Sequence, residues 1–176
     1  MASLPKAEPI PVEADEHVRI AFTLNGVSVQ TDVLPRQHLA DVLRQAFRLT
    51  GTHLGCEQGV CGACNILVDG KVARACLMLA IQADGADIFT IEGLTDSGII
   101  ADLQEAFVQR NALQCGFCTP GMLMIAHELL KQEPAPERKL IRETISGNLC
   151  RCTGYHAIID AVETTARARR EARDAS

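Results

Sequence analysis

Eight of the 176 residues are cysteines, and their spacing is the feature of this sequence with the clearest chemistry. They fall into two groups of four along the chain. The first group is Cys56, Cys61, Cys64 and Cys76, and the second group is Cys115, Cys118, Cys150 and Cys152. Four thiolates are the ligand set of one tetrahedral zinc ion or of one iron–sulfur cluster. Each group therefore could hold one metal centre.

The first group has the spacing C-x4-C-x2-C followed by a single distant cysteine, which is the spacing of plant-type [2Fe–2S] ferredoxins. Structural zinc sites favour two short arms of two cysteines each, and this group has only one such arm. Gly55, Gly59, Gly62 and Ala63 surround the first three cysteines. A loop that wraps a cluster must turn sharply and bring its N–H groups close to sulfur, which residues without bulk allow. The first group thus favours a [2Fe–2S] cluster over zinc.

The second group consists of a C-x2-C pair and a C-x-C pair that are separated by 31 residues. Each pair precedes a predicted helix, residues 120–132 and residues 155–172 respectively. Helix N-termini carry free N–H groups and the positive end of the helix dipole, which favour thiolates and an anionic cluster. The spacing taken alone could equally hold zinc, so both metal centres stay open for this group.

Alternating apolar residues predict strands around the first group. Such a pattern runs through residues 18–24, and Asn25-Gly26 predicts a hairpin turn into residues 27–29. Asp69-Gly70 predicts a second hairpin between residues 66–68 and 71–73, with a helix near residues 39–47 between the hairpins and a last strand at residues 87–91. These elements resemble the β-grasp fold of plant-type ferredoxins over residues 17–92.

Helical patterns replace strand patterns after residue 98. We expect a turn-rich linker at residues 93–98 and helices at 99–111, 120–132, 138–146 and 155–172. The second of these helices is apolar nearly all round, so it should be the buried one. Four short helices predict a small bundle over residues 99–176. The fold class is therefore α+β, with a ferredoxin domain followed by a four-helix bundle domain.

Composition limits the functional classes. The formal charge is 17 − 22 = −5 and there is no basic block, which argues against nucleic acid or an anionic membrane as the main partner. No apolar run approaches the length of a membrane span. Residues 1–16 are proline-rich and lack the features of an export signal, so we expect a flexible tail and a cytoplasmic protein. In a reducing cytoplasm, thiols are metal ligands more often than disulfides.

Three motifs together resemble one family. They are QCGFCTPG at residues 114–121, NLCRCTGY at residues 148–155, and GCEQGVCGAC at residues 55–64 with Cys76. The chain resembles the iron–sulfur subunit, or the N-terminal iron–sulfur region, of the molybdenum hydroxylases, which include xanthine oxidase, aldehyde oxidoreductase and carbon monoxide dehydrogenase. The resemblance covers about residues 17–165.

This resemblance implies an electron-transfer subunit with two [2Fe–2S] clusters, one on each group of four cysteines. It implies that the cluster of the second group lies next to molybdopterin, contacted by Gln114 and Cys152, and that the cluster of the first group lies on the flavin side. Electrons would pass singly from molybdopterin through both clusters to FAD, while oxygen from water is inserted into a substrate C–H bond or CO is oxidised.

The length of the chain indicates that it is one subunit of such an enzyme and not catalytic alone. No Gly-rich phosphate-binding motif is present, so pterin, flavin and substrate should be bound by other chains. The family implies a large subunit with molybdopterin in its cytosine dinucleotide form and a medium FAD subunit, as a dimer of heterotrimers. Two alternatives compete, a free-standing ferredoxin and a zinc-binding adaptor.

Three further side chains invite a functional interpretation. His53 lies close to Cys56, but four cysteines already complete that ligand set, so we expect an outer or surface histidine. His127 shares a helix face with leucines, which favours a packed or interface role. Arg151 lies between two expected ligands, where its positive charge would favour the reduced cluster or could instead pair with a partner subunit.

Overall fold

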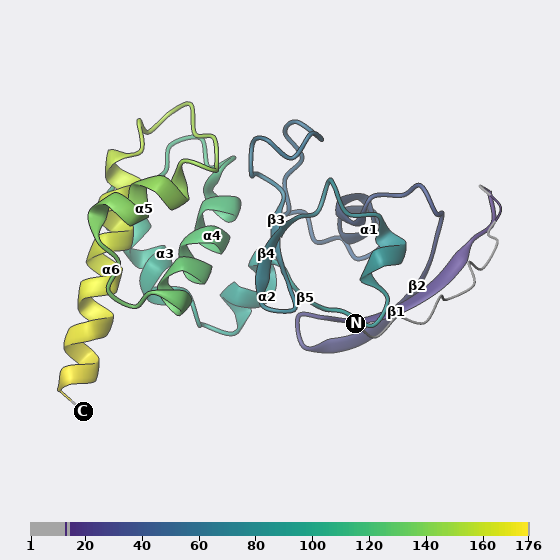
Figure 1. Cartoon of the computed structure of the whole chain (residues 1–176), viewed down its shortest axis with the longest axis horizontal. Coiled ribbons are helices and arrows are strands. Elements are labelled where there is room, and N and C mark those ends of the chain that lie inside the picture. Colours follow the sequence, from purple (N-terminus) through teal and green to yellow (C-terminus); the bar gives the residue numbers. More distant parts are fainter. Residues whose placement is uncertain (1–12, 14, 176) are drawn as a thin grey trace, which may run out of the picture.

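The computed structural model describes residue 13 and residues 15–175. These residues form a sheet-based half and a helical half, which lie next to each other along the long axis of the molecule (Figure 1). The predicted α+β class is confirmed. The flexible tail expected at residues 1–16 lies for the most part outside the described residues.

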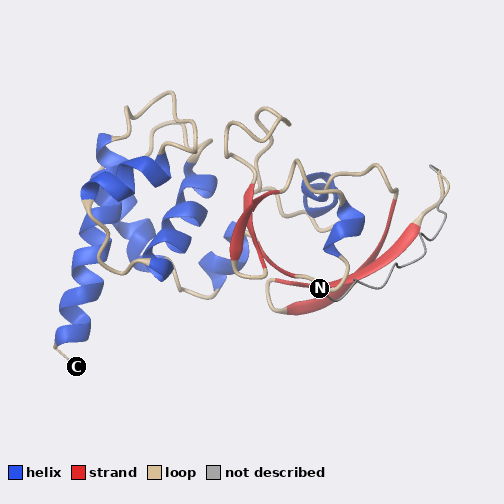
Figure 2. Ribbon diagram, in the orientation of Figure 1, coloured by secondary structure: helices blue, strands red, loops and turns tan. Residues whose placement is uncertain are grey.

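A five-stranded sheet in the order β2-β1-β5-β3-β4 forms the first half (Figure 2). The strands are β1 (Val18–Leu24), β2 (Val27–Val33), β3 (Asn65–Val68), β4 (Lys71–Arg74) and β5 (Asp87–Phe89). Both predicted hairpins are present, because β1 pairs antiparallel with β2 and β3 pairs antiparallel with β4. The last strand joins the two hairpins, since β5 runs parallel to β1 and antiparallel to β3.

The curved sheet wraps around helix α1 (Leu39–Gln45) and the short 3₁₀ helix η1 (Ala80–Ala83) (Figure 2). Ile20 and Phe22 of β1 are 2% and 3% exposed, as their alternation along the strand predicts. Leu39 and Leu43 lie one turn apart on α1 and are fully buried against the sheet. This core supports the ends of β3 and β4. Three cysteines of the first group lie in the segment between α1 and β3, and the fourth lies just after β4.

The segment predicted as a linker at residues 93–98 is largely helical, and this expectation was wrong. Helix α2 covers Ile91–Asp96, so that Ile91 begins a helix and does not end a strand. A Cβ built at Gly93 would lie 2.3 Å from Asn25 Oδ1, so the helix approaches the β1–β2 turn as only glycine allows. Asn25 Oδ1 also accepts a hydrogen bond of 2.8 Å from the Thr90 N–H, beside the start of α2. A tertiary contact therefore overrides the local turn preference of glycine.

The second half consists of four helices at nearly the predicted positions. They are α3 (Ala101–Gln109), α4 (Thr119–Gln132), α5 (Arg138–Ile145) and α6 (His156–Asp174). Helix α3 packs against α6 and α4, and α5 packs against α4 and α6. Met122 and Met124 of α4 are fully buried, as the apolar sequence of this helix predicts. That the four helices form a self-contained bundle stays a prediction.

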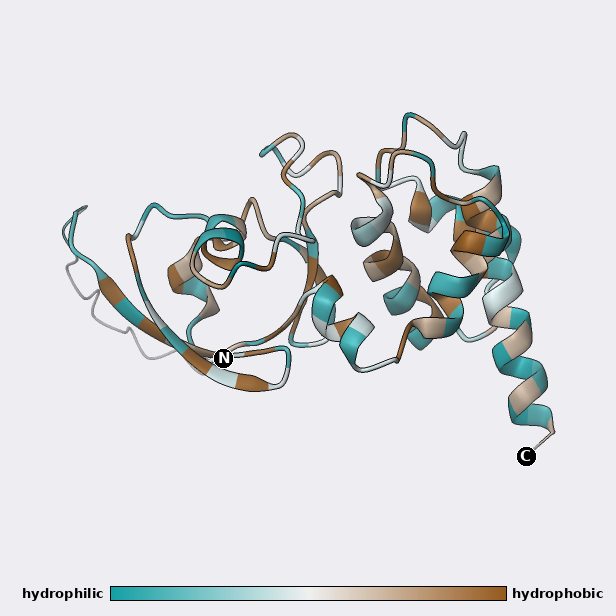
Figure 3. Cartoon of the chain, turned by 180° about the vertical axis from the view of Figure 1, so that it is seen from behind, coloured by the Kyte–Doolittle hydropathy of each residue, from teal (hydrophilic) through white to brown (hydrophobic). Residues whose placement is uncertain are grey.

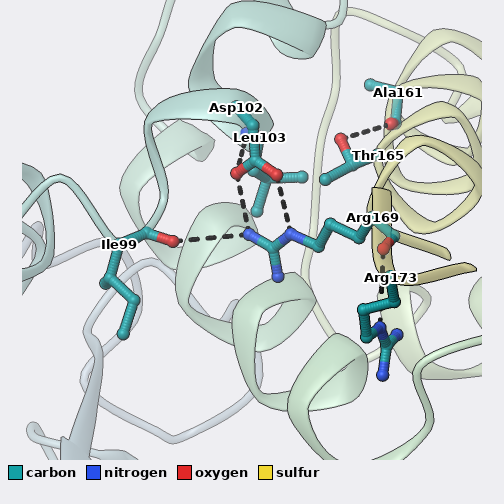
Figure 4. Close-up of polar contacts among 7 residues, drawn as sticks. All are labelled: Ile99, Asp102, Leu103, Ala161, Thr165, Arg169 and Arg173. Carbon is teal, nitrogen blue, oxygen red and sulfur yellow. Dashed lines mark hydrogen bonds and ion pairs between the residues drawn. The ribbon is translucent and has the colours of Figure 1, made fainter. Parts of the chain in front are cut away.

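Helix α6 extends beyond the other helices, and its last turns are mostly hydrophilic, whereas apolar segments gather where α4, α5 and α6 meet (Figures 1 and 3). An ion pair ties this long helix to α3. Arg169 donates from Nε and Nη2 to the two carboxylate oxygens of Asp102 over 2.7 and 2.8 Å, and Arg169 Nη2 also reaches the Ile99 carbonyl (Figure 4). No helix in residues 15–175 has the length and apolar character needed to cross a membrane.

Candidate cluster-binding loops

Three loops that carry seven of the eight cysteines gather along one edge of the molecule, at the top of Figure 1. One loop precedes β3 and holds Cys56, Cys61 and Cys64, while Cys76 lies two residues after the end of β4. The other two loops precede α4 and α6. The fold therefore brings together segments that are up to about 95 residues apart along the chain.

The thiols of the first group lie in two contacting pairs. Cys56 interacts with Cys61, and Cys64 interacts with Cys76. The backbone N–H groups of Gln58 and Cys61 each donate to Cys56 Sγ over 3.4 Å. These hydrogen bonds lower the pKa of the Cys56 thiol to about 7. They favour the thiolate, which is the form that binds metal.

The second pair of this group is buried, since Cys64 and Cys76 are each 2% exposed. Burial raises the pKa of the Cys64 thiol to about 11, so metal binding must displace its proton. The loop turns with φ of 74° at both Gly59 and Gly62, the left-handed conformation that its glycines favour.

The second group is also arranged in two pairs. Cys115 and Cys152 Sγ atoms lie 3.6 Å apart, and Cys118 interacts with Cys150. Cys118 is the N-cap residue of α4, as expected for a thiolate at a helix N-terminus. Burial raises the pKa of the Cys118 thiol to about 12. Cys115 and Cys152 are exposed, whereas Cys118 and Cys150 lie further in.

Tyr155 braces the loop that carries Cys150. The Tyr155 hydroxyl accepts a hydrogen bond from the Cys150 N–H over 3.0 Å and donates one to the Asn148 carbonyl, also over 3.0 Å. The Thr153 hydroxyl lies 3.1 Å from Cys150 Sγ. Burial acts to raise the pKa of the Cys150 thiol, but hydrogen bonds from Thr153, Cys152 and Cys118 together outweigh burial and lower that pKa. Local hydrogen bonds thus prepare Cys150 as a thiolate.

Two pairs of thiols in each group fit a two-iron cluster, in which each iron takes two cysteine ligands. A single zinc ion would instead require four ligands that converge on one point. The donor sets therefore fit [2Fe–2S] clusters better than single zinc ions.

The structure also places the other residues that the sequence singled out. Gln114 is exposed next to Cys115, so Gln114 and Cys152 lie at the same exposed edge of the second group. His127 is 7% exposed, which confirms a packed histidine. Arg151 is exposed, and its effect on a cluster stays a prediction.

His53 has a role that the sequence did not show. Its Nδ1 donates to the Phe117 carbonyl over 2.7 Å, and the two rings stack with centroids 4.9 Å apart. His53 precedes the first ligand loop, and Phe117 lies between Cys115 and Cys118. Arg74 and Asn65, which no motif singled out, join the same loops by hydrogen bonds with Asn148, the first residue of the motif at residues 148–155. No local signal distinguishes Arg74 and Asn65, because their partners are distant in sequence.

Two family models match consecutive parts of the chain. A model described as "2Fe-2S iron-sulfur cluster binding domain" matches residues 22–87, and a model described as "[2Fe-2S] binding domain" matches residues 90–163. The first range contains Cys56 to Cys76, and the second contains Cys115 to Cys152.

Several known proteins resemble the chain over most of its length. Caffeine dehydrogenase subunit gamma of Pseudomonas sp. (strain CBB1) is 53% identical over 148 residues, which cover 82% of this chain and 89% of the relative. A probable xanthine dehydrogenase subunit of Bacillus subtilis (strain 168) is 45% identical over 167 residues, which cover 94% of this chain and 92% of that relative. The crystal structure of quinoline 2-oxidoreductase from Pseudomonas putida 86 matches with a TM-score of 0.83 and 53% identity, covering 88% of this chain and 97% of the matched chain.

Proposed function

The chain belongs to the family of small [2Fe–2S] iron–sulfur subunits of the molybdenum hydroxylases, and from this premise we propose that it relays electrons singly from a molybdopterin centre to FAD. The reaction served is hydroxylation of an organic substrate with oxygen from water, or oxidation of CO. The chain is thus the iron–sulfur subunit of an oxidoreductase.

The first group of cysteines is proposed to hold one [2Fe–2S] cluster and the second group another. A bound cluster would supply a centre that takes up and releases one electron at a time. The single observation that carries this assignment is the arrangement of each group in two thiol pairs, Cys56 with Cys61 and Cys64 with Cys76 in the first group. The protein itself supplies N–H donors to sulfur, such as those of Gln58 and Cys61 to Cys56 Sγ.

The second group is proposed to face the molybdopterin subunit. Cys115 and Cys152 are exposed beside Gln114, so a cofactor on another chain can approach them. Phe117 and Leu149, which are 48% and 54% exposed, flank the same loops. Exposed large apolar residues that cluster in this way are typical of protein contact surfaces.

The first group is proposed to face the FAD subunit. Val60 and Leu77 are each 60% exposed near the loop of the first group. A large molybdopterin subunit, with the cofactor in its cytosine dinucleotide form, and a medium FAD subunit would complete a heterotrimer that dimerises. Within the chain, we propose a β-grasp domain over residues 17–92 and a four-helix bundle domain over residues 99–176, which is supported by the single five-stranded sheet of the first half and by the packing of α3, α4, α5 and α6 on one another in the second.

Metal analysis of the complex purified from its native host tests the cluster assignment. We expect about four iron and four inorganic sulfide per chain, because four thiolates ligate each [2Fe–2S] centre. The reduced protein should show two distinct EPR signals, since the two groups differ in burial and hydrogen bonding. Stoichiometric zinc in either group would overturn the assignment of that group.

Co-purification tests the subunit role. A tag on this chain should recover one molybdopterin-containing protein and one flavoprotein in equal amounts. Recovery of a stable chain that carries both clusters but no partner would support the free-standing ferredoxin alternative.

A further inference from the structure

One arginine joins the two ligand loops directly. Arg74 ends β4, two residues before Cys76, and its guanidinium reaches into both halves of the molecule. Arg74 Nε donates to the Gly59 carbonyl in the loop of the first group over 3.2 Å. Arg74 Nη2 donates to the Gly147 carbonyl, at the end of α5, over 2.7 Å. The planar guanidinium thus bridges two backbone segments in a fixed geometry.

Two buried asparagines complete this bridge. Asn65 and Asn148 are 2% and 1% exposed, and Arg74 Nη1 donates to the Oδ1 atom of each. Asn65 Nδ2 donates to Asn148 Oδ1 and to the Gly121 carbonyl of α4, over 3.1 Å each. Asn148 Nδ2 donates to the Gly62 carbonyl over 3.3 Å. Every side-chain amide atom of the two asparagines therefore has a partner, as buried polar groups require.

The backbone around this network leaves no room for displacement. A Cβ built at Gly62 would lie 2.2 Å from Asn148 Oδ1, and one built at Gly121 would lie 2.2 Å from the Gly62 carbonyl oxygen. The first ligand loop therefore contacts α4 and the Asn148 segment at the closest approach that glycine permits. Satisfied buried networks of this kind rigidify the elements that they join.

We propose that Arg74, with Asn65 and Asn148, is a positioning device that sets the distance between the two clusters and hence the rate of electron exchange between them. This inference rests on the proposed function, because it presupposes two redox centres. One electron is exchanged, one cluster is oxidised as the other is reduced, and no bond is made or broken. Electron tunnelling slows exponentially with distance, so a small loosening of the loops has a large effect.

The location of the contacts argues against a role in folding alone. Arg74 and Asn148 bond to the carbonyls of Gly59, Gly62 and Gly147, which lie one to three residues from a cysteine along the chain. The sheet and the helices also contact each other apart from this hydrogen-bond network, because α4 packs against β3 and β4. Glu128 Oε1 also accepts a hydrogen bond of 2.9 Å from the Val72 N–H across that contact. The two halves therefore stay attached when Arg74 is replaced, while the ligand loops lose the hydrogen bonds that Arg74 makes to both of them.

Arg74→Gln in the complete complex tests the proposal, and Arg44→Gln is the matched control. Arg44 also donates to two backbone carbonyls, those of Thr50 and Thr52 over 2.7 and 2.9 Å, but both lie within the sheet-based half. Two readouts apply to each variant. The first is the magnetic coupling between the reduced clusters in low-temperature EPR, which falls with the inverse cube of their distance. The second is the rate at which electrons pass from one cluster to the other after substrate is mixed in.

We expect Arg74→Gln to retain both clusters, with weaker coupling and exchange that is slower by about 10- to 100-fold, the usual cost of removing an outer partner of a metal site. Arg74→Lys keeps the charge but not the bridge, so it should be slowed as well and serves as the test if Arg74→Gln does not assemble. Arg44→Gln should match the unaltered protein. Unchanged coupling and exchange in both Arg74 variants would overturn the proposal. Absence of iron in the unaltered protein would instead refute the proposed function.

Discussion

The Leu149 N–H donates a hydrogen bond to the Cys61 carbonyl oxygen over 2.8 Å. Cys61 belongs to the first group of cysteines, and Leu149 directly precedes Cys150 of the second group. The backbone of one ligand loop is therefore joined to that of the other by a single hydrogen bond. This contact offers a direct backbone route between the two proposed clusters.

Leu149→Pro should weaken this route, because proline has no N–H to donate. We expect a loss of stability of about 1–3 kcal/mol and slower exchange between the clusters, since the Cys61 carbonyl loses its partner. Rapid mixing of the complex with substrate measures the exchange. Leu149→Ala keeps the N–H and is the control for the loss of the exposed side chain. Equal rates of electron exchange in the Leu149→Pro and Leu149→Ala variants would show that this hydrogen bond is not needed for exchange between the clusters.

Gly121→Ala should separate the first ligand loop from α4. Alanine in a helix is normally more stable than glycine by about 1 kcal/mol. Here the added Cβ would lie 2.2 Å from a backbone oxygen, so we expect a destabilisation of about 1–3 kcal/mol instead. Gly147→Ala is the control, because a Cβ at that position meets nothing closer than 3.4 Å. Thermal unfolding of the complex measures the stability of both variants. A Gly121→Ala protein that is more stable than the unaltered one would contradict the close contact between Gly121 and the Gly62 carbonyl.

Cys64→Ser and Cys118→Ser should each remove one cluster and leave the other. Both side chains lie at the inner end of their group, so no neighbouring residue can replace the lost ligand. We expect the iron content to fall from about four to about two per chain, with loss of a different EPR signal in each variant. With Cys64→Ser, substrate should still reduce the remaining cluster, while flavin reduction becomes very slow. Flavin reduction at the native rate would refute the proposed order of the centres.

His127 should make the helical half less stable in mild acid. Burial lowers the pKa of His127, and the nearby charges of Arg169 and Lys131 lower it further, more than Asp102 and Glu128 raise it. The unfolded chain therefore takes up a proton below pH of about 6.5 that the folded chain does not. The contribution of His127 to the free energy of unfolding is fully present above that pH. The free energy of unfolding falls by at most about 1.4 kcal/mol per pH unit as the pH decreases towards the pKa of His127 in the folded state.

Thermal unfolding at several pH values checks this expectation. His127→Gln cannot be protonated, so its stability should decrease less between pH 7 and pH 5 than that of the unaltered protein. His156→Gln, at an exposed histidine at the start of α6, is the matched control for replacing a histidine by glutamine. If the stability of His127→Gln depends on pH in the same way as that of the unaltered protein, His127 does not contribute to the loss of stability in mild acid.

Local patterns were sufficient for most of the secondary structure. Asn25-Gly26 and Asp69-Gly70 predicted both hairpin turns, and their φ angles lie in the left-handed region, between 50° and 81°. The failure at α2 has a tertiary cause. Glycine at position 93 indicates a turn when only its neighbours are considered, but in the fold it allows α2 to lie against Asn25.

The sequence by itself determined the two groups of cysteines, the glycines that let the first loop turn, and the helices that begin after the second group. These features depend on residue types at short spacing, which local chemistry governs. Only the tertiary structure decided how the groups face each other. Arg74 and Asn148 are 74 residues apart, and Cys61 and Leu149 are 88 residues apart, so their contacts follow from the packing of α4 against the sheet and not from any local pattern.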